Sequence, residues 1–285
     1  MRKEFFMKRI LLFSLSVFFC FALTSEARGD RSGRWRPYSP RRYPPQNAGR
    51  WEGQRPPLGR GRMDAVSSPN MTKRRFTGRS GTLQYCQFAE NMNGSGAPSL
   101  LLVLHGRSGS GSDNTSQLSS PALRSLIPYL KRHAGKVIVL APQCPSGQDW
   151  TGGRGGTSLL PVLNELVREK CREFNISPGK CGITGISMGG GACYTFMAQY
   201  PGLFAKAIVV CAACRENDSV RLNGNFYIIH GENDQLSPAE RARQTAQSIS
   251  QKGNAQVKFT CLPGKDHISC AENAYTEACW KWMFQ

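Results

Sequence analysis

The chain has 285 residues, a formal net charge of +18 and 40% hydrophobic residues. This length and content allow one globular domain with a full core, which we place at residues 71–285. Only four histidines accompany the eleven cysteines, and the cysteine spacings do not fit a four-ligand zinc site. We therefore predict no metal ion and no other cofactor.

The first 27 residues have the parts of a secretory signal peptide. Four basic residues precede an apolar run at 10–23, and the small residues Ser25 and Ala27 suit cleavage after position 27. An uncleaved anchor is the alternative, but the run is short for a membrane span, which needs about 20 residues. Lipid attachment at Cys20 fits less well, because a large residue precedes it. We expect residues 1–27 to be removed, leaving a secreted or periplasmic chain without a transmembrane span.

Residues 28–70 form a second segment of distinct composition. Within it, residues 28–62 carry ten arginines and two acidic residues, a net charge of +8, with almost no aliphatic side chains. Such a segment cannot bury enough apolar surface to offset its chain entropy, so 28–70 is predicted to be a disordered basic linker. Two interpretations stay open, a solvated tether and a contact to an anionic surface or polymer. We expect no nucleic-acid partner.

Cysteine usage also favours export. Ten cysteines follow the predicted signal peptide, and an even number in an exported chain suits disulfides, although their pairing cannot be derived from the sequence. Cys211 and Cys214 have the spacing of a redox motif. The thioredoxin-like context is missing, which argues against a redox role.

Apolar runs of strand length alternate with helical patterns along residues 71–285. Continuous apolar runs are typical of strands that are covered on both faces. The expected strands are 100–106, 136–142, 181–184, 207–211, 226–231 and 257–264. The expected helices are 159–174, 190–200 and one that starts at a capping box at 237–240. This alternation predicts an α/β fold, with a mainly parallel, doubly wound sheet and helices on both faces.

A G-x-S-x-G pattern at residues 185–189 places Ser187 between the expected strand 181–184 and the helix 190–200. A nucleophile elbow needs this context, because only small residues fit around so tight a turn. The alternative is a glycine-rich turn with an idle serine. A serine hydroxyl is a weak nucleophile at neutral pH, so the site also needs a base and an acid that orients it.

In this fold class the chain order is serine, acid, histidine. Of the two histidines after Ser187, His230 ends a buried strand and is interpreted as structural. His267 lies in a loop after the last strand and is the expected base. Asp234 is the expected acid, with Glu232 as the alternative. Asp266, next to the base, is expected to be exposed.

The oxyanion of an acyl-transfer intermediate needs two backbone N–H donors. We expect one from Met188, directly after the nucleophile. The second should come from the loop at 105–109, where Arg107 is the first choice and Ser108 the alternative. A phosphate-binding loop would also be glycine-rich, but the lysine of a P-loop is absent here.

With these residues identified, the domain resembles the α/β-hydrolase superfamily. More narrowly, it resembles the secreted phospholipase/carboxylesterase or prolyl-oligopeptidase-like branch whose members are often labelled predicted peptidases. The matching stretches are LHGRSGSGSDN, VLAPQCPSGQDW, TGISMGGG, HGENDQLSP and LPGKDH. The resemblance implies the same Ser187–Asp234–His267 triad. It further implies that Asp113 and Asn114 brace the oxyanion loop and that Trp150 walls the substrate pocket. Arg107 departs from the small residue common in such enzymes.

The connection after the strand 207–211 is too short for a lid domain, and residues 28–70 cannot form a propeller, so we expect an open cleft. The leading interpretation is a serine carboxylesterase that acts on a small ester or an ester-decorated polymer, such as acetyl or feruloyl groups on polysaccharide. A serine peptidase of the same branch is the first alternative. A binding protein on a hydrolase scaffold is the second, although the complete set of Ser187, Asp234 and His267 argues against it.

Overall fold

The structure is a computed structural model. It describes residues 71–93, 96–133, 135–153, 156–215, 218–251 and 255–285. The predicted signal peptide (1–27) and linker (28–70) lie outside the described residues and stay predictions. Among the helices that the structure does describe, none combines the length and the apolar character needed to cross a bilayer.

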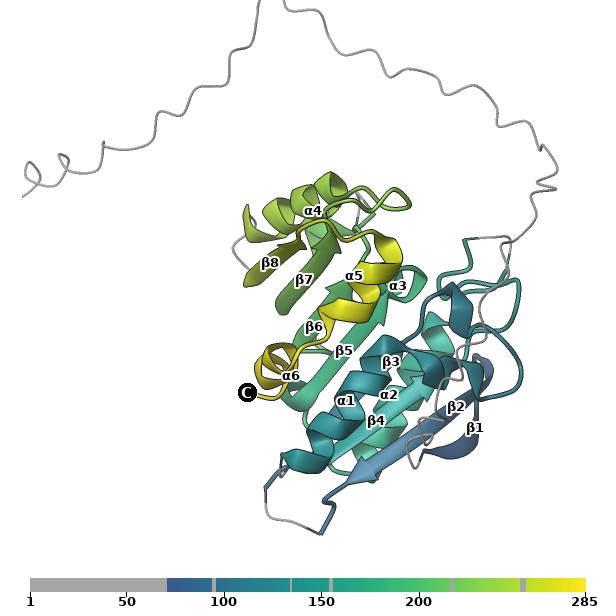
Figure 1. Cartoon of the computed structure of the whole chain (residues 1–285). Helices are drawn as coiled ribbons and strands as arrows, with labels where there is room; N and C mark the ends of the chain where they lie inside the picture. The colour runs from purple at the N-terminus through teal and green to yellow at the C-terminus, as the bar shows by residue number, and fades with distance from the viewer. Residues whose placement is uncertain (1–70, 94–95, 134, 154–155, 216–217, 252–254) are drawn as a thin grey trace, which may run out of the picture. The chain divides into compact units, whose positions relative to one another are not determined.

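The described residues form an eight-stranded sheet in the order β1-β2-β4-β3-β5-β6-β7-β8 (Figure 1). The strands are β1 Thr72–Gly78, β2 Gly81–Glu90, β3 Ser99–Leu104, β4 Val137–Pro142, β5 Cys181–Ile186, β6 Lys206–Val210, β7 Asn225–Gly231 and β8 Val257–Leu262. β2 runs antiparallel to both β1 and β4, and the pairs from β4 to β8 are parallel. The predicted mainly parallel sheet is confirmed, with an antiparallel edge that the sequence analysis did not predict.

Helices cover both faces of this sheet (Figure 1). They are α1 Pro121–Arg132, α2 Leu160–Glu173, α3 Met188–Gln199, α4 Ala239–Gln251, α5 His267–Ala274 and α6 Glu277–Phe284. One apolar core packs α2, α3 and α4 against the sheet, and a second core packs α1, α5 and α6 against it. Two cores on opposite faces are what a doubly wound sheet requires, so the predicted fold class is confirmed.

The loops at the carboxyl ends of the parallel strands carry the candidate site. In the connection between β6 and β7, residues 211–224, the described part contains a single turn of 3₁₀ helix, Ser219–Arg221. This leaves no room for a lid domain there. One detail of the prediction is wrong: His267 does not lie in a loop but is the first residue of α5. Asp266 caps that helix, because its carboxylate accepts the backbone N–H of Ser269 at 2.7 Å.

The expectation of disulfides is also contradicted. None of the ten cysteines in the described residues is in a disulfide. The sulfurs of Cys171 and Cys181 lie 3.4 Å apart, beyond the S–S bond length of about 2.05 Å. Most of these side chains are buried in the two apolar cores, where cysteine packs as a small hydrophobic residue.

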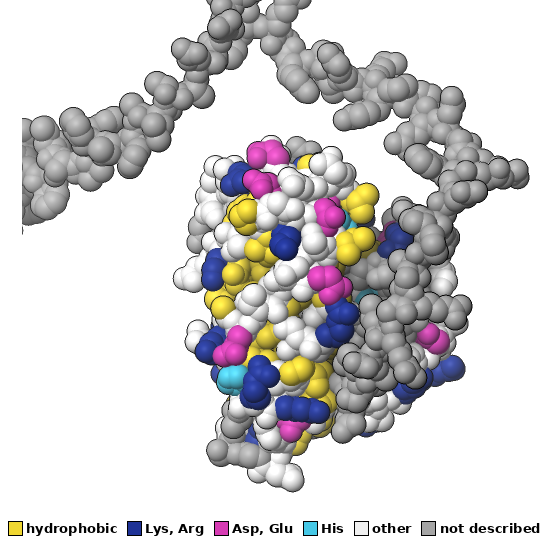
Figure 2. All heavy atoms as spheres, in the orientation of Figure 1, with side chains coloured by type: hydrophobic (Ala, Val, Ile, Leu, Met, Phe, Trp, Pro, Cys, Tyr) yellow, Lys and Arg dark blue, Asp and Glu magenta, His cyan; other side chains and the backbone are white. Residues whose placement is uncertain are grey.

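The chain's basic excess is not concentrated on the face drawn in Figure 2. There basic, acidic and hydrophobic side chains are mixed over the helices and loops. Mixed signs of charge do not create the strong single-sign field that holds an anionic polymer. This face therefore does not by itself favour binding of an anionic polymer.

Candidate active site

Ser187 stands at the turn between β5 and α3. Its backbone has φ 54° and ψ −114°, a conformation that L-residues rarely adopt. The surrounding chain fixes this conformation. The N–H of Ser187 donates to the Val210 carbonyl at 2.9 Å, and its own carbonyl accepts the Gly191 N–H at 2.9 Å. The strain therefore belongs to the fold and holds the serine at the amino end of α3.

The flanking glycines are required by close packing. A Cβ on Gly185 would lie 2.4 Å from the Gly189 backbone, and one on Gly189 would lie 2.1 Å from the Leu104 carbonyl oxygen. Both distances are far below van der Waals contact, so a larger residue would push α3 away from β3 and β5. This is the physical reason for the G-x-S-x-G spacing.

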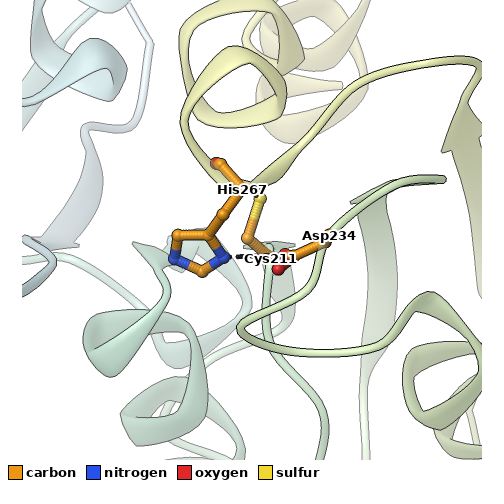
Figure 3. A group of neighbouring side chains, drawn as sticks. All are labelled: Cys211, Asp234 and His267. Atoms are coloured by element: carbon orange, nitrogen blue, oxygen red, sulfur yellow. Dashed lines mark hydrogen bonds and ion pairs between the residues drawn. The ribbon is translucent and has the colours of Figure 1, made fainter.

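The structure brings Asp234 and His267 together from the ends of β7 and β8. Nδ1 of His267 lies 2.7 Å from Oδ2 of Asp234, and Figure 3 shows the imidazole turned towards that carboxylate. Oδ1 of Asp234 accepts the backbone N–H groups of Leu236 and Ser237, each at 2.9 Å. The side chain of Asp234 is fully buried, so these donors replace water around the carboxylate.

Glu232, the alternative acid, is directed elsewhere. Its Oε2 accepts the Gly264 N–H at 2.8 Å, and the side chain is exposed. Asp266 is exposed as expected and caps α5. Of the three acidic candidates, only Asp234 has a hydrogen bond to His267 in the described residues.

Cys211 connects the serine and histidine parts of the site. It follows Val210, whose carbonyl accepts the Ser187 N–H, and its thiol donates to the His267 carbonyl at 3.5 Å. A hydrogen bond with Cys270 and burial both raise the pKa of the Cys211 thiol. A thiol held in its protonated form is a poor nucleophile.

The described residues contain one cluster of side chains of the types that bind metal ions, with potential ligand atoms within 4.8 Å of one another (Figure 3). Its members are Cys211, Asp234 and His267. Metal binding would require a deprotonated thiol and the imidazole nitrogen that now faces Asp234. The hydrogen bonds of this group instead serve the acid–base pair.

The loop that we expect to supply the second oxyanion donor begins at His105. Nε2 of His105 accepts the backbone N–H of Cys144 at 3.0 Å, so the proton must be on Nδ1, which donates to the Gly106 carbonyl at 2.5 Å. Arg107 follows, and both Arg107 and Met188 line the same pocket as Ser187. The sequence analysis missed this role of His105.

Gln143 braces the loop from the other side, a contact that the sequence analysis also missed. Its amide donates to Asp113 Oδ1 at 2.6 Å and to the Gly109 carbonyl at 3.3 Å, and its oxygen accepts the Asn114 N–H at 2.7 Å. The Ser116 hydroxyl and the Gln143 amide hold the pKa of the Asp113 carboxyl well below its usual range. Asp113 and Asn114 are thus linked through Gln143 to the loop that contains Gly109, and their role in bracing an oxyanion loop stays a prediction.

His105 should make the fold sensitive to acid. Burial lowers the pKa of His105 from 6.5 to about 4. Between these two pH values the His105 side chain is protonated in the unfolded chain and neutral in the folded chain. The free energy of unfolding should therefore be highest above pH 6.5. It should fall as the pH drops towards 4, by on the order of 3 kcal/mol from this group. Urea unfolding at pH 7.5, 5.5 and 4.5 measures the loss.

The matched variant for this test is His105→Gln, which keeps a polar side chain but cannot titrate. Its stability should be lower at pH 7.5 and should change less between pH 7.5 and 4.5 than that of the wild type. His133→Asn, at a partly exposed position, should keep the wild-type slope. Equal slopes for wild type and His105→Gln would contradict the assignment.

A pocket of about 320 Å³ adjoins Ser187. Trp150 forms a buried wall of it, held by a hydrogen bond from its indole N–H to the His105 carbonyl at 3.1 Å. Arg107 and Arg215 also line it, and Arg215 donates to the Thr151 hydroxyl at 2.9 Å. Asp149 is the acidic residue of the lining, so the pocket carries more positive than negative charge. Arg215 was not among the expected site residues.

Comparisons with known proteins point to the same fold. Residues 158–278, which include Ser187, Asp234 and His267, match the model of the dienelactone hydrolase family. Over 76% of its length the chain superposes on a thermostable esterase, with 24% identity and a TM-score of 0.64.

The chain has the α/β-hydrolase fold.

Two further solved structures have the same fold. A ferulic acid esterase gives a TM-score of 0.58 at 12% identity, over 75% of this chain and 97% of that chain. The acylaminoacyl peptidase of Pyrococcus horikoshii gives 0.57 at 14% identity, over 77% of this chain. The chain spans 63% of the length of the thermostable esterase and 41% of that of the peptidase. A comparison with curated protein sequences gives no match.

Proposed function

We propose that this protein is an exported serine carboxylesterase that works through an acyl-enzyme. The observation that carries the proposal is the 2.7 Å hydrogen bond between Nδ1 of His267 and Asp234. In this hydrogen bond Nδ1 of His267 keeps its proton and donates to the carboxylate, so Nε2 is the nitrogen that accepts the proton of Ser187 in the proposed reaction. The strained turn at Ser187 then presents the hydroxyl above the amino end of α3.

In the proposed reaction, the Ser187 oxygen attacks the ester carbonyl while His267 takes its proton. The backbone N–H groups of Met188 and Arg107 hold the oxyanion of the tetrahedral intermediate. His267 then returns the proton to the leaving alcohol, and the acyl group stays on Ser187. A water molecule, deprotonated by His267, attacks the acyl-enzyme; the bond between the acyl carbon and the Ser187 oxygen then breaks, His267 returns the proton to that oxygen, and the acid is released.

The short connection between β6 and β7, which in its described part holds no lid, and the esterases among the structural neighbours support an ester as the substrate, either small and soluble or carried on a polymer such as acetylated or feruloylated polysaccharide. The test is a panel of p-nitrophenyl acetate, a feruloyl ester, acetylated xylan and a peptide anilide. We expect turnover of the esters and little or none of the anilide. Turnover of the anilide alone would favour the peptidase alternative. Inactivity of both wild type and Ser187→Ala on every ester would favour a binding protein.

The charge of the pocket predicts a preference within the esters. Arg107 and Arg215 should attract an acyl group that ends in a carboxylate, because hydrogen bonds to charged groups contribute about 1.5–3 kcal/mol. Arg215→Ala should lower kcat/KM for a p-nitrophenyl hemisuccinate by about 10–100-fold. It should change kcat/KM for p-nitrophenyl butyrate by less than about threefold. Equal losses on both substrates would mean that Arg215 supports the pocket wall and does not bind the substrate.

We further propose that residues 1–27 direct export and that residues 28–70 act as a tether outside the catalytic domain. Deleting residues 28–62 should leave turnover of p-nitrophenyl acetate unchanged within about twofold. If the segment also adheres to an anionic polymer, full-length protein should bind it at low salt and be released as salt screens the attraction. Equal binding by full-length and truncated protein would leave the segment as a spacer only. A large loss of turnover would contradict both roles.

A further inference from the structure

A second histidine contacts the carboxylate that we propose as the catalytic acid. His230 is on β7, and its side chain is fully buried. Its Nε2 lies 2.6 Å from the Ser237 carbonyl oxygen and 3.2 Å from Asp234 Oδ2. A carbonyl oxygen only accepts hydrogen bonds, so Nε2 of His230 carries a proton that it donates to Ser237, and Asp234 Oδ2 is a second, more distant neighbour of the same nitrogen.

The other ring nitrogen fixes the protonation state. Nδ1 of His230 is buried and has no hydrogen-bond partner. A positively charged imidazole would place a second N–H at this atom, and an N–H without an acceptor in the protein interior is costly. His230 is therefore a neutral side chain whose single N–H donates to Ser237 and lies beside Asp234 Oδ2.

Both histidines use the same carboxylate oxygen. Oδ2 of Asp234 lies 2.7 Å from Nδ1 of His267 and 3.2 Å from Nε2 of His230, while Oδ1 accepts two backbone N–H groups. Every neighbour of the carboxylate in this set is a donor. The N–H of His230 therefore draws negative charge from the oxygen that orients His267.

The backbone of Ser237 links Asp234 to His230. Its N–H donates to Asp234 Oδ1, and its carbonyl accepts from His230. The contact pins the loop that carries Asp234 back onto β7. A shift of this loop would move Oδ2 relative to His267, and such geometry must hold within about 0.5 Å in a working site.

We propose that His230 is a positioning residue that fixes Asp234 Oδ2 against His267 and limits how strongly the carboxylate stabilises the protonated imidazole. The role of His267 as a base rests on the proposed function. Four titratable groups surround the pair: Cys211 and Asp266 near His267, Cys270 one helical turn beyond it on α5, and His230 behind the carboxylate.

The test uses His230→Leu, which fills a similar volume without the N–H, and His230→Gln, whose amide nitrogen can reach the place of Nε2. Loss of the N–H leaves more negative charge on Oδ2, which stabilises protonated His267. In His230→Leu the ascending limb of the kcat/KM–pH profile should move to higher pH by about 0.5–1 unit, and kcat should fall about tenfold. His230→Gln should restore most of both.

Ile228→Ala is the matched control, because it weakens β7 on the same face two residues earlier and does not touch Asp234. It should lower the melting temperature and leave the pH profile unmoved. If His230→Leu also leaves the profile unmoved, or if His230→Gln shifts it as far as His230→Leu, His230 has only a structural role and the proposal is overturned.

¹⁵N-imidazole NMR separates this proposal from the proposed function. Wild type should show His230 as the neutral Nε2–H tautomer across the pH range of the folded protein, and His230→Leu should shift the titration of His267 to higher pH. These results do not require turnover. If the wild type is inactive on esters but shows the expected NMR shift, the esterase proposal is wrong and the role of His230 stands. If the enzyme is active but His230 is charged near neutral pH, the esterase proposal stands and the role of His230 is wrong.

Discussion

Ser187→Ala should lower kcat for p-nitrophenyl acetate by about 10⁴–10⁶ while the fold stays intact. Without the hydroxyl no acyl-enzyme can form, and the remaining rate comes from substrate binding and the oxyanion donors. The backbone bonds that hold residue 187 run through its N–H and carbonyl, so they do not depend on the side chain. Initial rates, together with a melting temperature within a few degrees of the wild type, measure both parts of the prediction.

Ser108→Ala is the matched control for this loss. Ser108 is an exposed serine in the oxyanion loop, and its replacement keeps the backbone N–H. The variant should retain activity within about threefold. A fluorophosphonate probe should label wild type and Ser108→Ala at Ser187 and should not label Ser187→Ala. Labelling of Ser187→Ala at the wild-type rate would place the nucleophile elsewhere.

Most of the parallel strands were predictable because they are continuous apolar runs, and β3, β4, β5 and β7 are almost entirely buried. β8 is only partly buried and includes the exposed Lys258. β1 and β2 were not predicted, and β1 is not a continuous apolar run because it exposes Lys73, Arg74 and Arg75. α1 was obscured by Pro121 at its start and Pro128 in its interior, and α5 and α6 have only eight residues each. Short helices give too few turns for a clear period.

The serine, acid and base candidates were predictable because local rules place them: a glycine-flanked turn, and loops that follow buried strands. The groups that support them were not predictable. Gln143 reaches the oxyanion loop across 34 residues of sequence, and His105 holds Cys144 across 39. The signal that could have been used is the His-Gly pair, which directly follows β3 at His105 and ends β7 at His230. A polar residue at the end of a buried strand needs a partner in the loops.

Asp234→Asn should lower kcat by about 10⁴ and should also destabilise the fold. The four groups around the carboxylate, two backbone N–H groups and the two histidines, are all donors. The amide that Asp234→Asn introduces would have to turn its NH₂ group towards two of these groups. The backbone N–H groups cannot become acceptors, whereas a histidine can by moving its ring proton to the other nitrogen. The NH₂ should therefore face Nδ1 of His267, and the ring proton of His267 should then be on Nε2.

In that tautomer His267 presents an N–H to Ser187 and cannot take its proton, which is why a change of one atom should cost so much activity. Glu232→Gln is the matched control: Glu232 is exposed and bonds only the Gly264 N–H in the described residues, so activity should stay within about threefold. Active-site titration separates a slow enzyme from a smaller folded fraction. The assignment of the acid is wrong if Asp234→Asn keeps near-wild-type kcat per folded molecule while Glu232→Gln loses it.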